Sequence, residues 1–362
     1  MEKAIVTGAT GFIGFALVKR LVESGIKVYA VVREQSREIS KLIQLPDVTV
    51  IGCNLADMEE LPAKIQERQF DCFYHLAWQG VANEDSQNLE VQLANVKYSC
   101  DAVFAANELK CKRFVFPSSI MEYEVAKLMK TELNAQRRNI YRTAKIAATY
   151  MTRIEANNAN ILYNSAIISN VYGVGEISNR FINTTLRKFI RGEHASFTAA
   201  QQMYDFIYIE DAVRMLQLIG EKGVANRSYY IGNEKPRKLI EFIYEMRDCV
   251  DTQIKLGIGE SKEYVGVSLD YTEVDTGTCY TDFQFQNEYS FTDGIKKTIE
   301  WIRSTEVDEN SKHSNTVVIS SSGWVLAVNP DRSARIFDIC DYGFVGDFGQ
   351  VITAFQTHKD FT

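Results

Sequence analysis

Short apolar runs alternate with helical periods through the first third of the chain. The apolar runs place hydrophobic residues on consecutive positions, as in Val28-Tyr29-Ala30-Val31-Val32, which is typical of strands covered on both faces of a parallel sheet. Repeated β-α units of this kind require right-handed crossovers, so we predict a doubly wound α/β fold of the Rossmann type whose ligands bind beyond the carboxyl ends of the strands. The pattern predicts strands at residues 3–7, 27–32, 48–53, 70–76 and 113–117, and helices at residues 12–24, 36–45, 58–67 and 88–108.

A glycine-rich turn, Thr7-Gly8-Ala9-Thr10-Gly11-Phe12-Ile13-Gly14, joins the first predicted strand to the first predicted helix. Gly8 permits a tight turn, and Gly11 lets backbone amides approach a pyrophosphate at the positive end of the helix dipole. Gly14 lets the helix pack closely on the sheet. This spacing predicts a dinucleotide site, and the alternative is a glycine-rich turn without a ligand. The predicted cofactor residues of the turn are Gly8, Thr10, Gly11, Phe12, Ile13 and Gly14.

Arg33 follows the second predicted strand, where an acidic residue would bind the adenosine ribose hydroxyls of NAD. Its planar cationic group suits a 2′-phosphate instead, which favours NADP(H) over NAD(H). The alternative is a solvated arginine paired with Glu34 or Glu38, which would leave the preference open.

Tyr141 and Lys145 lie four residues apart in a predicted helix over residues 140–154, so their side chains share one face. A lysine ammonium near a phenol stabilises the phenolate, and we therefore expect Lys145 to lower the pKa of Tyr141. Such a pair can act as general acid/base at a sugar or alcohol hydroxyl while hydride moves to or from nicotinamide. Ser118 and Ser119 end the fifth predicted strand, from which a hydroxyl could bind the same substrate oxygen.

Together these residues resemble the extended short-chain dehydrogenases/reductases of the NAD-dependent epimerase/dehydratase family, most of which act on nucleotide sugars. The similarity extends from residue 3 to about residue 303. Asn54-Leu55-Ala56-Asp57 resembles the adenine stretch of that family, with Asn54 in place of an aspartate, and Tyr74-His75-Leu76-Ala77 resembles its pyrophosphate segment. Beyond the glycine turn and Arg33, the predicted cofactor residues are Asn54, Leu55, Leu76, Ala77, Trp78, Asn95, Tyr141 and Lys145.

The resemblance implies a catalytic triad of Ser119, Tyr141 and Lys145. It also implies that Asn170, in Asn170-Val171-Tyr172-Gly173, faces the substrate together with Ser119. Glu122 lies near this site and either contacts the sugar or is a solvated loop carboxylate. We expect a flexible loop over residues 124–138, which are charged and irregular.

Two departures from the family pattern bear on the substrate. Tyr204 stands where many members carry an arginine that contacts the nucleotide diphosphate. The run Ser119-Ile120-Met121-Glu122 lacks the adjacent Asp-Glu pair with which 4,6-dehydratases eliminate water, which counts against dehydratase activity. The sequence therefore favours an epimerase or a 4-keto-sugar reductase, with a non-catalytic dinucleotide sensor or scaffold as the alternative.

The resemblance divides the chain into a Rossmann domain (1–168, its sheet completed by later segments) and a substrate lobe (169–305). A polar linker (306–315) and an appended segment (316–362) follow. The last segment resembles the C-terminus of electron-transfer flavoprotein alpha subunits, in which the counterparts of Asn329 and Asp347 lie at FAD. A flavin-linked electron carrier is therefore a further alternative. Since only about forty residues of a much larger flavin domain are present, FAD is not expected here.

Composition narrows the remaining possibilities. A net charge of −7 without a basic run argues against nucleic-acid partners, and no apolar run is long enough to span a membrane. Seven scattered cysteines without a C-x-x-C pair suit reduced thiols, and four unclustered histidines predict no metal centre. The chain enters a strand within three residues, leaving no room for a signal peptide, so we expect a cytoplasmic protein. Family habit suggests a homodimer formed by the helices at 88–108 and 140–155.

Overall fold

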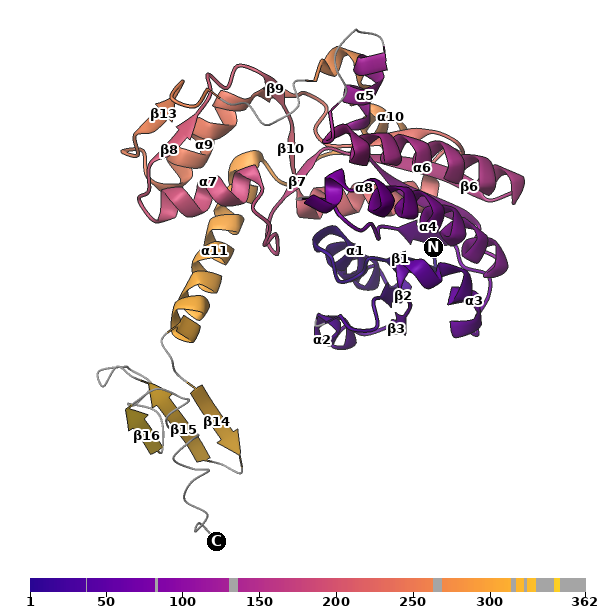
Figure 1. Ribbon diagram of the computed structural model, residues 1–362, viewed down its shortest axis with the longest axis horizontal. Coiled ribbons are helices and arrows are strands. Elements are labelled where there is room, and N and C mark those ends of the chain that lie inside the picture. The colour runs from indigo at the N-terminus through magenta and orange to yellow at the C-terminus, as the bar shows by residue number, and fades with distance from the viewer. Residues whose placement is uncertain are drawn as a thin grey trace. The chain divides into compact units, whose positions relative to one another are not determined.

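The computed structural model describes residues 1–36, 38–81, 84–129, 136–262, 269–313, 317–321, 324–329 and 342–345. Its N-terminal part is built on a seven-stranded sheet (Figure 1). All of its strand pairs are parallel. The order β11-β6-β5-β4-β1-β2-β3 reverses direction between β1 and β4, which confirms the predicted doubly wound fold. The strands are β1 (Lys3–Thr7), β2 (Lys27–Val32), β3 (Val48–Gly52), β4 (Cys72–His75), β5 (Arg113–Ser119), β6 (Leu162–Ile168) and β11 (Ser228–Ile231).

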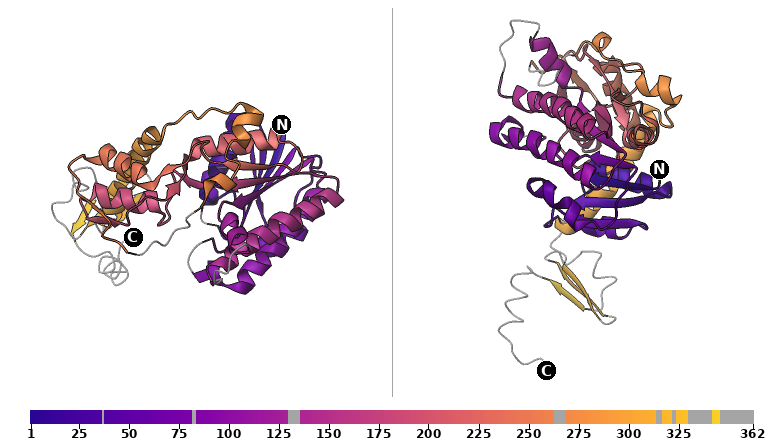
Figure 2. Two further views of the ribbon diagram at one scale, coloured as in Figure 1. Left: turned by 90° about the horizontal axis from the view of Figure 1, so that it is seen from above. Right: turned by 90° about the vertical axis from the view of Figure 1, so that its right-hand side faces the viewer.

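Helices cover both faces of this sheet (Figure 2). One face packs against α4 (Leu89–Glu108) and α6 (Asn139–Asn158), whose buried alanines and valines join a core with Phe73, Phe114 and Tyr163 of the strands. The small side chains let the helices approach the aromatic residues of the sheet closely. On the other side, α1 (Phe12–Glu23) and α8 (Ile209–Lys222) pack together, and Arg20 Nε donates to Gln217 Oε1 at 2.8 Å.

The segments that follow β6 in the sequence of the first unit, Met1–Lys296, also form small sheets and helices. β7 (Asn170–Tyr172) pairs with β10 (Phe206–Tyr208), β8 (Ala195–Phe197) with β13 (Leu256–Ile258), and β9 (Met203–Tyr204) with β12 (Arg237–Lys238). The helices here are α7 (Phe181–Ile190), α9 (Leu239–Val250) and α10 (Thr278–Phe283). Among the described residues, none of the helices combines the length and apolar character that crossing a membrane requires.

Several element boundaries differ from the sequence expectations. The helix expected at 36–45 is the shorter α2 (Ile39–Ile43), and that expected at 58–67 is the turn η1 (Leu55–Glu60) followed by α3 (Leu61–Lys64). Residues 124–129 of the loop expected at 124–138 instead belong to α5 (Glu122–Met129), and residues 130–135 lie outside the described residues. Glu124 forms a buried ion pair with Arg142 of α6 rather than facing water.

The second unit, Lys297–Thr362, contains most of α11 (Phe291–His313) and a three-stranded sheet. This helix continues through most of the linker predicted at 306–315. The sheet has the order β14 (Val317–Ser321), β15 (Trp324–Asn329), β16 (Tyr342–Val345). Asp347 lies outside the described residues, so the flavoprotein resemblance stays a prediction. The four-part division of the chain also stays a prediction.

Candidate active site

The glycine turn lies where the strand order reverses, with its backbone against the segment after β4. Gly8 has φ +66°, and a Cβ there would lie 2.8 Å from the Ala77 amide nitrogen. A Cβ on Gly14 would lie 2.1 Å from the Gly8 carbonyl oxygen, so Gly14 lets α1 approach the turn itself. Gly11 is the N-cap of α1, and in this described helix no side chain caps the N-terminus and no acid occupies the first turn. The first-turn amides are thus available to an anion.

The ends of β1 and β4 are joined through a threonine hydroxyl. The Ala77 amide donates to Thr7 Oγ1 at 3.1 Å, and the same oxygen lies 3.1 Å from His75 Nδ1. His75 is fully buried, and burial, followed by the charge of Lys145, lowers its pKa to about 3. His75 is therefore neutral and fixes the strand end rather than serving as a base.

The loop after Ala77 is anchored to α4 by two amide side chains. Asn95 donates from Nδ2 to the Gln79 carbonyl at 2.8 Å and accepts from the Gln79 amide at 2.9 Å. Gln92 accepts from Trp78 Nε1 at 3.0 Å and donates to Gly80 and Asp85 carbonyls. The side-chain amide of Asn95, which was predicted among the cofactor residues, thus hydrogen-bonds to this loop. Gln92 was missed, because its partners lie on a loop whose path the sequence does not reveal.

The three predicted catalytic residues lie together at the carboxyl end of β5. Tyr141 and Lys145 are one turn apart on α6, Ser119 is the last residue of β5, and the Ser119 side chain acts on the Tyr141 phenol, whose pKa it lowers. Trp78 covers both α6 residues, with its ring 6.1 Å from that of Tyr141 and 3.8 Å from Lys145 Nζ. The site therefore adjoins the loop after β4. This strand pairs with β1, which leads into the glycine turn.

The acid-base balance of the pair differs from the expectation. Burial raises the pKa of Tyr141 to about 12, against the opposing effects of Arg180 and Ser119. Burial lowers the pKa of Lys145 to about 7, against the charge of Glu122, and Lys145 Nζ donates to the Pro117 carbonyl at 3.0 Å. The expected lowering of the Tyr141 pKa by Lys145 is therefore wrong for this structure, because removal from water disfavours both charged forms.

Glu122 is neither a solvated carboxylate nor part of a loop. It lies in the first turn of α5, and its Oε1 accepts from the Ser118 hydroxyl, from the Ser119 amide at 3.3 Å and from Thr149 Oγ1 at 3.2 Å. Burial raises its pKa, against these donors and the charge of Lys145. The carboxylate thus contacts both the end of β5 and α6.

The remaining predicted residues surround this centre. Asn54 donates from Nδ2 to Asp57 Oδ2 at 3.1 Å and precedes Leu55 at the start of η1. Asn170 donates to the Asp205 carbonyl at 2.9 Å, which ties β7 to the segment before β10. The loop after β7 approaches the cofactor turn, since a Cβ on Gly175 would lie 3.8 Å from Phe12. Thr10 and Ile13 share the turn with Phe12, and Leu76 follows β4.

Arg33 is exposed just after β2, and the carboxylates that we considered as its partners bind lysines. Oε1 of Glu34 lies 3.2 Å from Nζ of Lys64, and Glu38 forms an ion pair with Lys41. Arg180, the N-cap of α7, was missed; its charge acts on the Tyr141 phenol although the two are far apart in the sequence.

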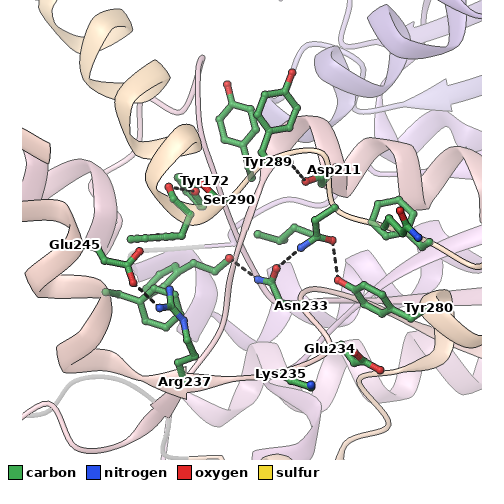
Figure 3. Close-up of a pocket in the computed structure, with 18 residues that line it drawn as sticks. Tyr172, Asp211, Asn233, Glu234, Lys235, Arg237, Glu245, Tyr280, Tyr289 and Ser290 are labelled. Atoms are coloured by element: carbon green, nitrogen blue, oxygen red, sulfur yellow. Dashed lines mark hydrogen bonds and ion pairs between the residues drawn. The ribbon is translucent and has the colours of Figure 1, made fainter.

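A cavity of about 780 Å³ includes none of the predicted site residues (Figure 3). Its polar groups mostly bind one another: Asn233 accepts from Asn287, which in turn accepts from the Tyr280 hydroxyl at 2.8 Å, and Arg237 pairs with Glu245. Aromatic rings, including Tyr172 and Phe242, form much of the rest. The cavity belongs to the C-terminal segments and not to the Ser119–Tyr141–Lys145 site.

Known proteins share both the sequence pattern and the fold. Residues 4–232 match the model of the "NAD dependent epimerase/dehydratase family", which covers more than half of the chain. A dTDP-glucose 4,6-dehydratase from Escherichia coli is 22% identical over 348 residues, covering 86% of this chain and 95% of the relative. A CDP-abequose synthase from Salmonella typhimurium is 26% identical over 233 residues, covering 63% of this chain and 73% of the relative.

Among solved structures, the Bordetella bronchiseptica enzyme WbmF in complex with NAD+ and UDP has a TM-score of 0.67 at 21% identity. The match covers 86% of this chain and 94% of that enzyme, and at this identity it supports the fold alone. The family match confirms the resemblance and the enzyme class inferred from the glycine turn and the triad residues. The chain belongs to the NAD dependent epimerase/dehydratase family and is an enzyme of the extended short-chain dehydrogenase/reductase type.

Proposed function

We propose that this enzyme transfers hydride between NADP(H) and a nucleotide sugar at a hydroxyl- or keto-bearing carbon, as a 4-keto-sugar reductase or a 4-epimerase. The observation that carries the proposal is the convergence of Ser119, Tyr141 and Lys145 beside Trp78, next to the strand end that adjoins the glycine turn. The similarity to a CDP-abequose synthase supports a nucleotide-linked substrate.

The residues around the glycine turn fit a dinucleotide. Side-chain-free positions at Gly8 and Gly14 and the uncapped start of α1 leave a cradle of backbone amides for a pyrophosphate. Lys145 would hold the ribose hydroxyls, and Trp78 would border the nicotinamide. When bound, the nicotinamide supplies or accepts the hydride.

The protein's own residues supply the proton chemistry. With its pKa raised to about 12, Tyr141 is a neutral phenol near pH 7, so it can donate a proton from its hydroxyl to a carbonyl oxygen that gains hydride. Ser119 would orient that oxygen with its hydroxyl. A protonated phenol favours the reductive direction, and the replacement of the Asp-Glu pair by Ile120 and Met121 argues against elimination of water.

The preference for NADP(H) rests on Arg33. It is exposed after β2, the strand whose end binds the adenosine ribose in this fold, and Glu34 and Glu38 have lysine partners. Its guanidinium is therefore available to a 2′-phosphate.

A homodimer is proposed from exposed apolar residues on the two helices that pack side by side, α4 and α6. Residues at helical spacing form one stripe on each helix, and their burial would be favourable. Sedimentation equilibrium at micromolar concentration tests this, and a monomer would contradict it. The exposed residues are Leu89, Leu93 and Phe104 on α4 and Tyr150, Met151 and Ile154 on α6.

Incubation with UDP-, dTDP- and CDP-linked sugars and their 4-keto forms separates the two activities. Stoichiometric loss of the NADPH absorbance band shows a reductase, whereas appearance of the 4-epimer without net loss of cofactor shows an epimerase. If neither occurs with any of these sugars, the proposed function fails.

A further inference from the structure

One half-buried carboxylate connects the strand and the helix that carry the predicted triad. Glu122 Oε1 accepts from Ser118 and from the Ser119 amide at the end of β5, and from Thr149 on α6. Thr149 Oγ1 also lies 2.9 Å from the carbonyl of Lys145, one turn earlier on α6. A single oxygen atom of Glu122 thus connects the backbone of one triad residue to the helical turn of another.

We propose that Glu122 is a positioning residue that fixes Ser119 against the turn of α6 that carries Lys145 and supplies negative charge to the site. The inference rests on the proposed function, because the roles of Ser119 and Lys145 do. It gives Oε1 of Glu122 a structural role, and the predicted contact of Glu122 with the sugar stays a prediction.

The surroundings of Lys145 explain why such a charge is needed. Lys145 is 4% exposed, and it lies against the rings of Trp78, at 3.8 Å, and Phe116, at 5.1 Å. Its Nζ donates to the neutral Pro117 carbonyl. Burial lowers the pKa of Lys145, and the carboxylate of Glu122 opposes this effect.

The same charge acts on four titratable residues around the site. On α6 it raises the pKa values of Lys145 and Tyr141, on α5 it raises that of Tyr123, and on β6 that of Tyr163. Arg180 and Arg142 act on Tyr141 in the opposite direction. Removal of the Glu122 charge therefore shifts the ionisation of both Lys145 and Tyr141 to lower pH.

Glu122→Gln separates charge from position, because the amide oxygen can still accept from Ser118, Ser119 and Thr149. We expect the midpoint at which NADPH affinity falls with rising pH to move down by about 0.5–1 pH unit, a three- to tenfold change in Lys145 ionisation. Thr149→Val removes one positioning bond and no charge, so it should weaken turnover without moving the midpoint. Glu155→Gln, an exposed glutamate of α6, is the matched control and should match the wild type.

A double-mutant cycle tests the pairing without any cofactor or sugar. At pH 6, Glu122→Gln should increase the equilibrium constant for unfolding, and the factor of increase should be about three- to tenfold larger in the wild type than in a Lys145→Met background. Equal effects in both backgrounds, or an unmoved NADPH midpoint in a folded Glu122→Gln protein, would overturn the proposal. Failure of the proposed function would instead appear as absent NADPH binding and turnover with the coupling between Glu122 and Lys145 intact.

Discussion

The ammonium group of Lys145 lies 3.8 Å from the centroid of the Trp78 ring. The contact is a cation–π interaction in a buried site, where such contacts contribute more than at the surface. Trp78 in turn is held by Gln92 through its indole nitrogen at 3.0 Å. The loop after β4, which would border the cofactor, therefore also stabilises the charged form of a triad residue.

Lys145 should make the stability of the protein depend on pH. Its pKa is about 7 in the folded protein against 10.5 when unperturbed, so between these values the unfolded chain binds more protons. The free energy of unfolding should therefore rise with pH between about 7 and 10.5 and level off below pH 7, where lysine is protonated in both states. We expect Lys145→Met to remove about 1–3 kcal/mol of the rise between pH 7.5 and 9.5, measured by urea denaturation. Parallel curves for the two proteins would contradict the burial of a titrating lysine.

Gly14→Ala should disrupt the cofactor turn. The added Cβ would lie 2.1 Å from the Gly8 carbonyl oxygen, and the atoms closest to it are all backbone atoms of Gly8 and Ala9. We expect α1 to shift, with a loss of about 1–3 kcal/mol in the free energy of unfolding and at least a tenfold weaker NADPH affinity by fluorescence titration. Gly277→Ala is the matched control, since a Cβ there would have contacts no closer than 3.7 Å. Equal NADPH affinities for the two variants would show that the turn does not hold the cofactor.

Arg33→Ala should change which cofactor is preferred. Loss of a charge-assisted contact to the 2′-phosphate costs about 1.5–3 kcal/mol, so NADPH should bind at least tenfold more weakly while NADH changes little. Lys41→Ala removes an exposed cation of α2 that pairs with Glu38 and serves as the control. If Arg33→Ala weakened NADH and NADPH alike, or neither, the predicted preference would be wrong.

The parts of the fold that follow from local sequence were predictable, and those that depend on distant partners were not. Consecutive apolar residues such as those of β2 mark a strand covered on both faces, whatever the rest of the chain does. The helix α5 was missed because Glu122 and Glu124 look like solvated residues until Ser118, Thr149 and Arg142 are brought to them.

The candidate site shows the same division. The spacing of Tyr141 and Lys145 places them on one face of α6, and that much is local. Their pKa values depend on burial under Trp78, from the loop after β4, and Phe116, from the middle of β5. The sign for Tyr141 was therefore predicted wrongly. Arg180 reaches the site only through the fold of the C-terminal segments.

Tyr141→Phe tests the central claim most directly, since it removes only the phenolic oxygen. The measurement is the rate of NADPH oxidation or of 4-epimer formation with whichever UDP-, dTDP- or CDP-linked sugar the wild type converts, alongside NADPH affinity. Loss of the general acid should reduce the rate about 10²–10⁴-fold with NADPH affinity within about threefold of the wild type. An unchanged rate in a folded Tyr141→Phe protein would contradict the assignment of Tyr141 as the proton donor.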